Sequence, residues 1–118
     1  ISGLHDTCVA DSNLRGWTLG IKNAAEGEHS DPRFFFHLHG DRSRQRTVVM
    51  APKAYQPAKW RHLAVTYDGE VVRLFVDGTQ VATGHGQRGQ LFSHPSTPCK
   101  KILLGELICL SMAFHFSL

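Results

Sequence analysis

The stretch WRHLAVTYDGEVVRLFVDGTQVATG, residues 60–84, decides the fold of this chain. Apolar residues alternate along its two runs, so that one face of the extended chain carries Leu63, Val65, Tyr67, Val72, Leu74 and Val76. Asp68-Gly69 separates the runs and Asp77-Gly78 follows the second, and aspartate before glycine is ordinary hairpin-turn chemistry. The stretch therefore predicts a β-meander in which both aspartates have structural roles.

Similar runs, rich in aromatic and β-branched residues, lie outside this stretch. Strands are expected at residues 17–22, 33–39, 46–50, 60–67, 71–77 and 80–83. Trp60 is placed in one of them, on the partly buried face opposite Leu63. The runs recur about every 8 to 15 residues without a helical period, which predicts an all-β fold, a sandwich or a barrel.

Length and composition predict a single domain over residues 1–118. The chain is 42% hydrophobic and 19% charged, as expected of a folded segment. A formal charge of +3, without an RNP-like, zinc-finger or helix-turn-helix pattern, argues against nucleic acid as a partner. Residues 102–118 are apolar but shorter than the roughly 20 residues that span a bilayer, so they predict strand or core. No signal peptide follows Ile1, which indicates a processed product or a part of a longer protein.

The three cysteines, Cys8, Cys99 and Cys109, lack the spacings of a zinc site or a redox pair. In an extracellular chain one pair would form a disulfide and leave the third cysteine over. A bridge from Cys8 to Cys99 would close most of the chain and contribute on the order of 4 kcal/mol by the loop-entropy model. The residues alone leave the pairing open.

Candidate metal ligands are few. His37 and His39 lie two residues apart and would share one face of a strand, and such a pair can bind zinc. No third or fourth ligand is identifiable, so these histidines are interpreted as the polar face of a strand that runs into a turn. Asp68 and Asp77 are the calcium candidates, but calcium takes six to eight oxygen ligands. The sequence thus predicts no metal and no cofactor in this segment.

Three arginines form the candidate binding feature. Arg42, Arg44 and Arg46 alternate, so on an extended chain they would line one face and could bind sulfate or carboxylate groups. The other interpretation is a solvated sheet edge whose charges prevent aggregation. No catalytic residues are predicted. Glu26 and Glu28 lie in a loop rather than across a cleft, and no GxSxG or HExxH motif occurs.

The core of the opening stretch resembles a family pattern. The matching residues are Trp60, His62 to Gly69, Leu74 to Gly78 and Val81-Ala82. They are similar to the core of laminin-G-like and pentraxin-like domains, which implies an antiparallel jelly-roll sandwich of the concanavalin type. A closer resemblance adds Arg15-Gly16-Trp17, Gly20-Ile21, Asp31 to Phe36, Gln80 to Thr83 and Cys99-Lys100. Over residues 4–105 the chain resembles the amino-terminal laminin-G-like module of the pappalysin family.

This resemblance implies a disulfide between Cys8 and Cys99, with Cys109 left odd. It also implies a module that is incomplete at its N-terminus, because the strand region before the equivalent of Leu4 is missing. Residues 106–114 depart from the family pattern, and residues 115–118 resemble its last strand again. An incomplete sandwich has open strand edges, which bears on whether the segment folds alone.

Pappalysins are secreted, extracellular zinc metalloproteases of the metzincin type that cleave insulin-like growth factor binding proteins. Their zinc motif lies downstream of this module, so the resemblance carries over no catalytic ligand. The leading hypothesis is a non-catalytic interaction or structural module, whose partners are the other domains of the protease and its protein substrate. The alternative is a lectin-like module that binds glycan or glycosaminoglycan through the three arginines. A third, a glucanase-like enzyme, requires a carboxylate pair that is not found.

Overall fold

The computed structural model describes residues 2–6, 15–23, 31–43, 45–91, 100–104, 107–108 and 115–116. All regular elements in these ranges are strands: β1 (Ser2–Asp6), β2 (Gly16–Asn23), β3 (Pro32–His39), β4 (Thr47–Met50), β5 (Leu63–Tyr67), β6 (Val72–Val76), β7 (Thr79–Gly84), β8 (Lys100–Leu104), β9 (Leu107–Ile108) and β10 (His115–Phe116). The expectation of an all-β fold is confirmed.

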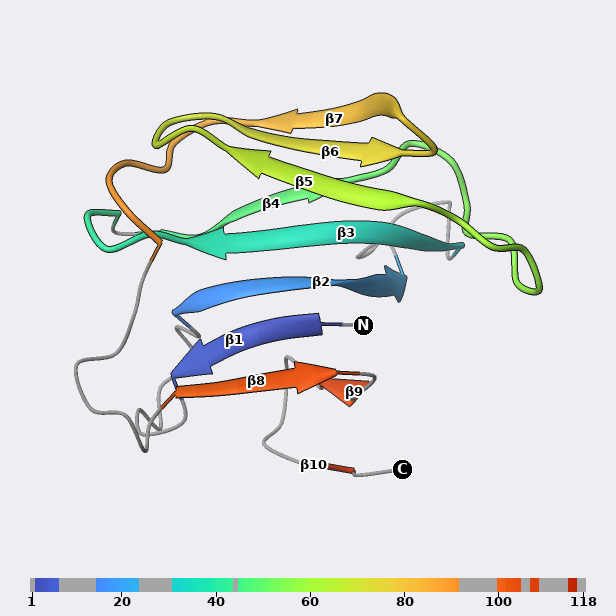
Figure 1. Ribbon diagram of the computed structural model, residues 1–118, viewed down its shortest axis with the longest axis horizontal. Coiled ribbons are helices and arrows are strands. Elements are labelled where there is room, and N and C mark those ends of the chain that lie inside the picture. The colour runs from blue at the N-terminus through green and yellow to red at the C-terminus, as the bar shows by residue number, and fades with distance from the viewer. Residues whose placement is uncertain are drawn as a thin grey trace.

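The strands form antiparallel sheets. A five-stranded sheet has the order β4-β3-β2-β1-β8, and a three-stranded sheet has the order β5-β6-β7. β9 and β10 pair separately with each other. In Figure 1 the three-stranded meander lies on the β4 side of the larger sheet, and β8 lies at the far edge. The meander predicted from residues 60–84 is the whole of the smaller sheet.

The core lies where the two sheets face each other. Its buried side chains are Phe34, Phe36, Leu38 and Val49 from the larger sheet, Ala51 from the loop that follows β4, and Val72 and Leu74 from the smaller sheet. Leu63, Val65 and Tyr67 of β5 pack against this cluster, so the predicted inward face of the meander is confirmed. Burial of apolar surface stabilises a fold by roughly 25 cal/mol per Å². The side chains of this shared cluster therefore hold the two sheets together.

The expected start of one strand was wrong. β5 begins at Leu63 rather than at Trp60, and Trp60 is fully exposed instead of half buried. The reason is local, because residues 57–58 form a turn in which Ala58 has a φ of 60°. The connection between β4 and β5 therefore continues to residue 62 as a loop.

The two aspartate turns reverse the chain by different means. At the β6–β7 hairpin Asp77 and Gly78 both have positive φ, 52° and 79°, as a two-residue type I′ turn requires. At the β5–β6 connection only Gly69 has a positive φ, of 101°. There the side chain of Asp68 closes the turn, as described below.

A β-bulge in β7 adds core contacts that alternation does not predict. Leu74 pairs with Ala82 and Phe75 pairs with Gln80, which leaves Val81 as the extra residue. As a result the adjacent residues Val81 and Ala82 both pack against the core. An unbulged strand would have turned one of them to the opposite face.

Gly84 permits the close approach of β7 to β4, and its replacement by alanine is expected to lower the free energy of unfolding by about 1–3 kcal/mol. An added Cβ would overlap Val49 Cγ1 and lie 2.7 Å from Thr47 Cγ2. Urea unfolding would measure the loss. Thr83→Ala, at an exposed position of the same strand, is the control and should shift the midpoint much less. Equal midpoints for Gly84→Ala and the parent chain would contradict this packing.

Candidate functional site

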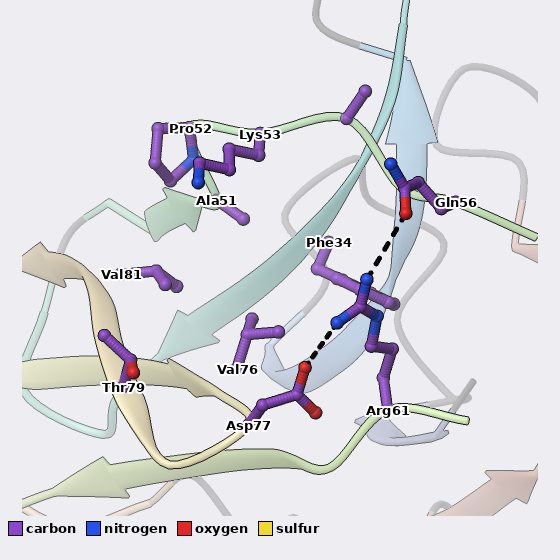
Figure 2. Close-up of a pocket in the computed structure, with 11 residues that line it drawn as sticks. Phe34, Ala51, Pro52, Lys53, Gln56, Arg61, Val76, Asp77, Thr79 and Val81 are labelled. Carbon is purple, nitrogen blue, oxygen red and sulfur yellow. Dashed lines mark hydrogen bonds and ion pairs between the residues drawn. The ribbon is translucent and has the colours of Figure 1, made fainter. Parts of the chain in front are cut away.

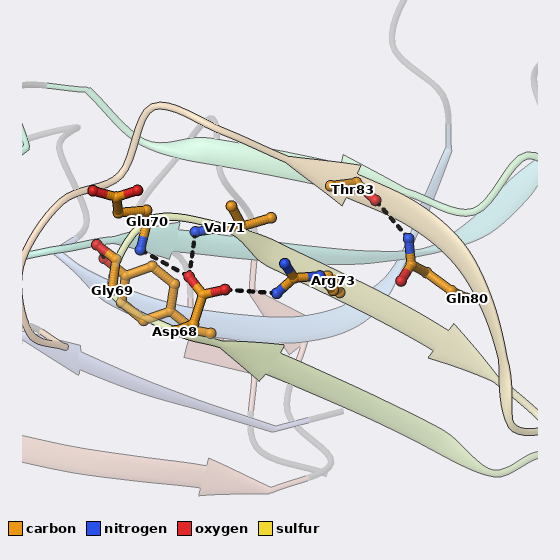
Figure 3. Close-up of polar contacts among 8 residues, drawn as sticks. Asp68, Gly69, Glu70, Val71, Arg73, Gln80 and Thr83 are labelled. Carbon is orange, nitrogen blue, oxygen red and sulfur yellow. Dashed lines mark hydrogen bonds and ion pairs between the residues drawn. The ribbon is translucent and has the colours of Figure 1, made fainter.

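Asp68 uses both carboxylate oxygens within its own turn (Figure 3). Oδ1 accepts the backbone N–H groups of Glu70 at 3.1 Å and Val71 at 2.8 Å, and Oδ2 accepts Arg73 Nη1 at 2.8 Å. The hydrogen bond from Arg73, followed by those from the two backbone amides, lowers the pKa of Asp68 to about 2. The side chain is thus an Asx-turn acceptor, a specific form of the structural role that the sequence predicted for Asp68.

The lowered pKa makes this turn sensitive to acid. The folded-state pKa of about 2 lies below the ordinary value of 3.8, so the stabilising contribution is complete above about pH 4 and is lost as the pH falls toward 2. We expect the thermal midpoint of the chain to fall more steeply over this window than that of an Asp68→Asn variant. Parallel pH profiles would show that Asp68 does not have this role.

Asp77 ties the second turn to the start of β5. Its Oδ1 accepts the N–H of His62 at 2.9 Å, its Oδ2 accepts Arg61 Nη1 at 2.6 Å, and its own N–H donates to His62 O at 2.8 Å. The hydrogen bond from His62, and then that from Arg61, lowers the pKa of Asp77. Both predicted turn aspartates therefore serve the backbone, and they lie in different turns.

A hollow of about 370 Å³ opens beside Asp77, between the β6–β7 turn and the loop after β4 (Figure 2). Phe34, Ala51, Val76 and Val81 are among its apolar lining residues. Its polar lining residues are Lys53, Gln56, Arg61, Asp77 and Thr79. Arg61 bridges two walls, because its guanidinium donates to Asp77 and, at 3.4 Å, to Gln56 Oε1. The volume lies within the range of small-ligand or side-chain pockets.

Gln87 organises the loops at the other end of β3. It is 2% exposed, its Oε1 accepts Gly40 N–H at 2.7 Å, and its Nε2 donates to Gln45 O at 2.7 Å and to Thr47 Oγ1 at 3.0 Å. Asp41 adds a second bridge, because its Oδ1 accepts Gln90 N–H at 3.0 Å. Sequence reasoning missed these hydrogen bonds of Gln87 and Asp41, since neither residue belongs to a motif that indicates a distant partner.

The histidine pair lies on β3, as expected, but not on a solvent-exposed face. His37 is 2% exposed and His39 is 5% exposed, and His39 Nε2 lies 2.9 Å from Ser43 O. β3 is therefore buried on both faces, since Phe35, which alternates with the core residues, is buried as well. Across the described ranges, no three histidine, cysteine or acidic side chains gather closely enough to hold a metal ion.

Arg42 and Arg46, the two described members of the arginine row, do not lie on a strand. Residues 41–42 form a turn, and Arg46 immediately precedes β4. Arg42 lies against Gly89, whereas Arg46 lies near Lys22 of β2, where burial and, to a lesser extent, the charge of Arg46 lower the pKa of Lys22. In the described part of the chain neither arginine forms an ion pair. Polyanion binding by this segment stays a prediction.

Several predicted residues lie outside the described residues. They are Cys8, Cys99 and Cys109, Arg44, and the loop glutamates Glu26 and Glu28. The disulfide between Cys8 and Cys99 accordingly stays a prediction from the resemblance. No helix in the described ranges is long and apolar enough to cross a membrane.

The comparisons with known proteins agree with this architecture. Residues 3–100 match the model of a laminin-G family described as the concanavalin A-like lectin/glucanases superfamily. Human pappalysin-1 is 45% identical over 105 residues, and mouse pappalysin-1 is 44% identical over 105 residues. Each match covers 89% of this chain but only 6% of the relative. The chain therefore spans a small fraction of the curated relatives that it matches.

Proposed function

Because the chain belongs to the laminin-G family of the concanavalin A-like lectin/glucanases superfamily, we propose that it is a non-catalytic module of a secreted pappalysin-type zinc metalloprotease. The parent enzyme would cleave insulin-like growth factor binding proteins, and the module would position the catalytic part or its substrate. The observation that carries the proposal is the 45% identity to pappalysin-1 over 89% of the chain. The sequence pattern also resembles that of pappalysin-2, and we propose that member of the family as the parent.

The use of the carboxylates supports a non-catalytic role. Asp68 accepts three hydrogen bonds, from the Glu70 and Val71 amides and from Arg73, and Asp77 accepts two, from Arg61 and the His62 amide, so both carboxylates stabilise the fold. Hydrolysis of a glycosidic bond needs two carboxyl groups facing each other across a sugar, and a protease of the metzincin type needs a histidine-bound zinc. The zinc ligands of the parent would come from its downstream part, where the pappalysin motif lies.

Two assays test this proposal. The 118-residue chain, incubated with zinc and an insulin-like growth factor binding protein, should leave the substrate intact. A pappalysin-1 variant that lacks the 105 matched residues should regain cleavage when the chain is added in trans. Zinc-dependent cleavage by the chain alone would refute the non-catalytic role. A failure of the chain to raise cleavage by the shortened enzyme would refute the positioning role.

A lectin-like module that binds glycan or glycosaminoglycan is the second candidate. The observation in its favour is the approach of Arg46 to Lys22, whose pKa is lowered mainly by burial and further by the charge of Arg46, because a bound sulfate or carboxylate would offset the repulsion between the two cations. On a heparin column, the chain should elute at lower salt after Arg42, Arg44 and Arg46 are replaced by alanine. Elution at an unchanged salt concentration would remove this candidate.

A further inference from the structure

The loop between β4 and β5, residues 51–62, is irregular but firmly held. We call it the Trp60 loop. Its Ala51 N–H donates to Phe34 O at 2.8 Å, and its Tyr55 N–H donates to Pro32 O at 2.6 Å. The Tyr55 ring packs edge-on against Phe34 with 5.3 Å between centroids. Such a loop has little conformational freedom to lose on binding, which favours recognition.

The loop presents an apolar side chain among positive charges. Trp60 is fully exposed, and tryptophan is among the residues most enriched at the energetic centres of protein interfaces. Lys53, Lys59 and Arg61 are the charged residues of the loop, which contains no aspartate or glutamate. Asp77, the carboxylate that lines the adjoining hollow, is already paired with Arg61 at 2.6 Å. The surface therefore attracts negative charge.

The hollow described above adjoins this loop, because Lys53, Gln56 and Arg61 of the loop are among its lining residues. Phe34, Val76 and Val81 line it with apolar surface, and Lys53 lies beside Ala51 and Pro52, across the hollow from Arg61 and Asp77 (Figure 2). Lys53 forms no ion pair in the described part of the chain. An apolar side chain of a partner could enter the hollow while a neighbouring carboxylate meets Lys53.

We propose that the Trp60 loop and the adjoining hollow form a docking site for an acidic polypeptide segment that carries an apolar side chain. The segment would seat that side chain in the hollow, place its carboxylates near Lys53 and Lys59, and pack against Trp60. The proposal deepens the proposed function, and rests on it for the choice of a polypeptide, by naming the surface through which the module would bind a protein.

The polar groups at the site favour a polypeptide over a sugar. A sugar needs several convergent donors and acceptors, but Asp77 is committed to Arg61 and His62, and Gln56 Oε1 already accepts Lys59 Nζ at 3.2 Å. What remains is mainly apolar surface with a cationic rim. That combination suits leucine or phenylalanine beside glutamate or aspartate.

The test uses the 118-residue chain and a fluorescein-labelled ten-residue peptide in which glutamate alternates with leucine, with fluorescence anisotropy as the readout. A peptide with lysine in place of glutamate is the probe control. Trp60→Ala and Lys53→Glu should each weaken binding of the acidic peptide by at least about tenfold. Arg88→Glu, the same charge change in the loop that holds Gln87 at the other end of β3, should leave the affinity within about twofold, because only the backbone N–H of exposed Arg88 is used, in a hydrogen bond to Ser43 Oγ. Unchanged thermal midpoints would show that the variants fold.

Several outcomes would overturn the proposal. These are equal binding of the two peptides, no saturable binding of the acidic peptide, or binding unaffected by Trp60→Ala and Lys53→Glu. Capture of heparin oligosaccharide that is lost in Trp60→Ala would make the site a glycan site instead. Self-association of the chain that is lost in Trp60→Ala would show instead that the site is a contact between two copies of this chain. Each of these results can occur while the trans-cleavage assay still succeeds, so the two proposals fail separately.

Discussion

Replacing Leu74 by alanine is expected to lower the free energy of unfolding by about 3–4 kcal/mol. Leu74 is 0% exposed and lies in the central strand of the smaller sheet, where its side chain joins the cluster shared by both sheets. The substitution removes apolar contacts and leaves a cavity that strands on both sides cannot close, because their backbones are fixed by ladder hydrogen bonds. Equilibrium unfolding in urea gives the loss directly.

Thr66→Ala is the matched control for Leu74→Ala. Thr66 lies on the neighbouring strand with an exposed side chain, so its loss should change the free energy by no more than about 0.5 kcal/mol. If Leu74→Ala were as mild as Thr66→Ala, the two sheets would not share the core described above.

Replacing Gln87 by alanine should cost about 2–4 kcal/mol, although no apolar core contact is involved. The substitution removes three hydrogen bonds and leaves the N–H of Gly40 and the carbonyl of Gln45 to find new partners near a buried site. Hydrogen exchange should show the Gly40 amide opening much faster in the variant. Gln90→Ala is the control, because only the backbone atoms of exposed Gln90 are used in the bridge to Asp41. Equal stability of the two variants would rule out this role for Gln87.

Strands β2 to β7 could be predicted from the sequence because each carries its own signal, whereas β1 was not among the expected strands. Alternation over residues 60–84 gave the inward face of the meander, since a strand with one buried face must place apolar residues at every second position. The two turns could be predicted from their aspartate-glycine pairs, because few residue types tolerate the positive φ that tight turns require. These features depend on neighbours in the chain.

The features that were missed depend on contacts distant in sequence. The hollow combines β3, the Trp60 loop and the β6–β7 turn, and the Gln87 bridge joins residues about forty positions apart. Trp60 was placed in a strand because a tryptophan beside an alternating run fits the pattern, whereas the turn at residues 57–58 depends on Ala58 adopting an unusual positive φ. Val81 departs from alternation through a bulge that its local sequence does not announce.

Every proposal made for this chain rests on the two sheets closing face to face, with β7 against β4. The most direct test is a set of nuclear Overhauser effects in the 118-residue chain. Val49 Cγ1 and Thr47 Cγ2 lie beside Gly84, so cross-peaks are expected between the Gly84 α protons and the methyl groups of both residues. Absence of these cross-peaks, together with rapid exchange of the Leu74 amide, would contradict the sandwich and the surfaces assigned to it.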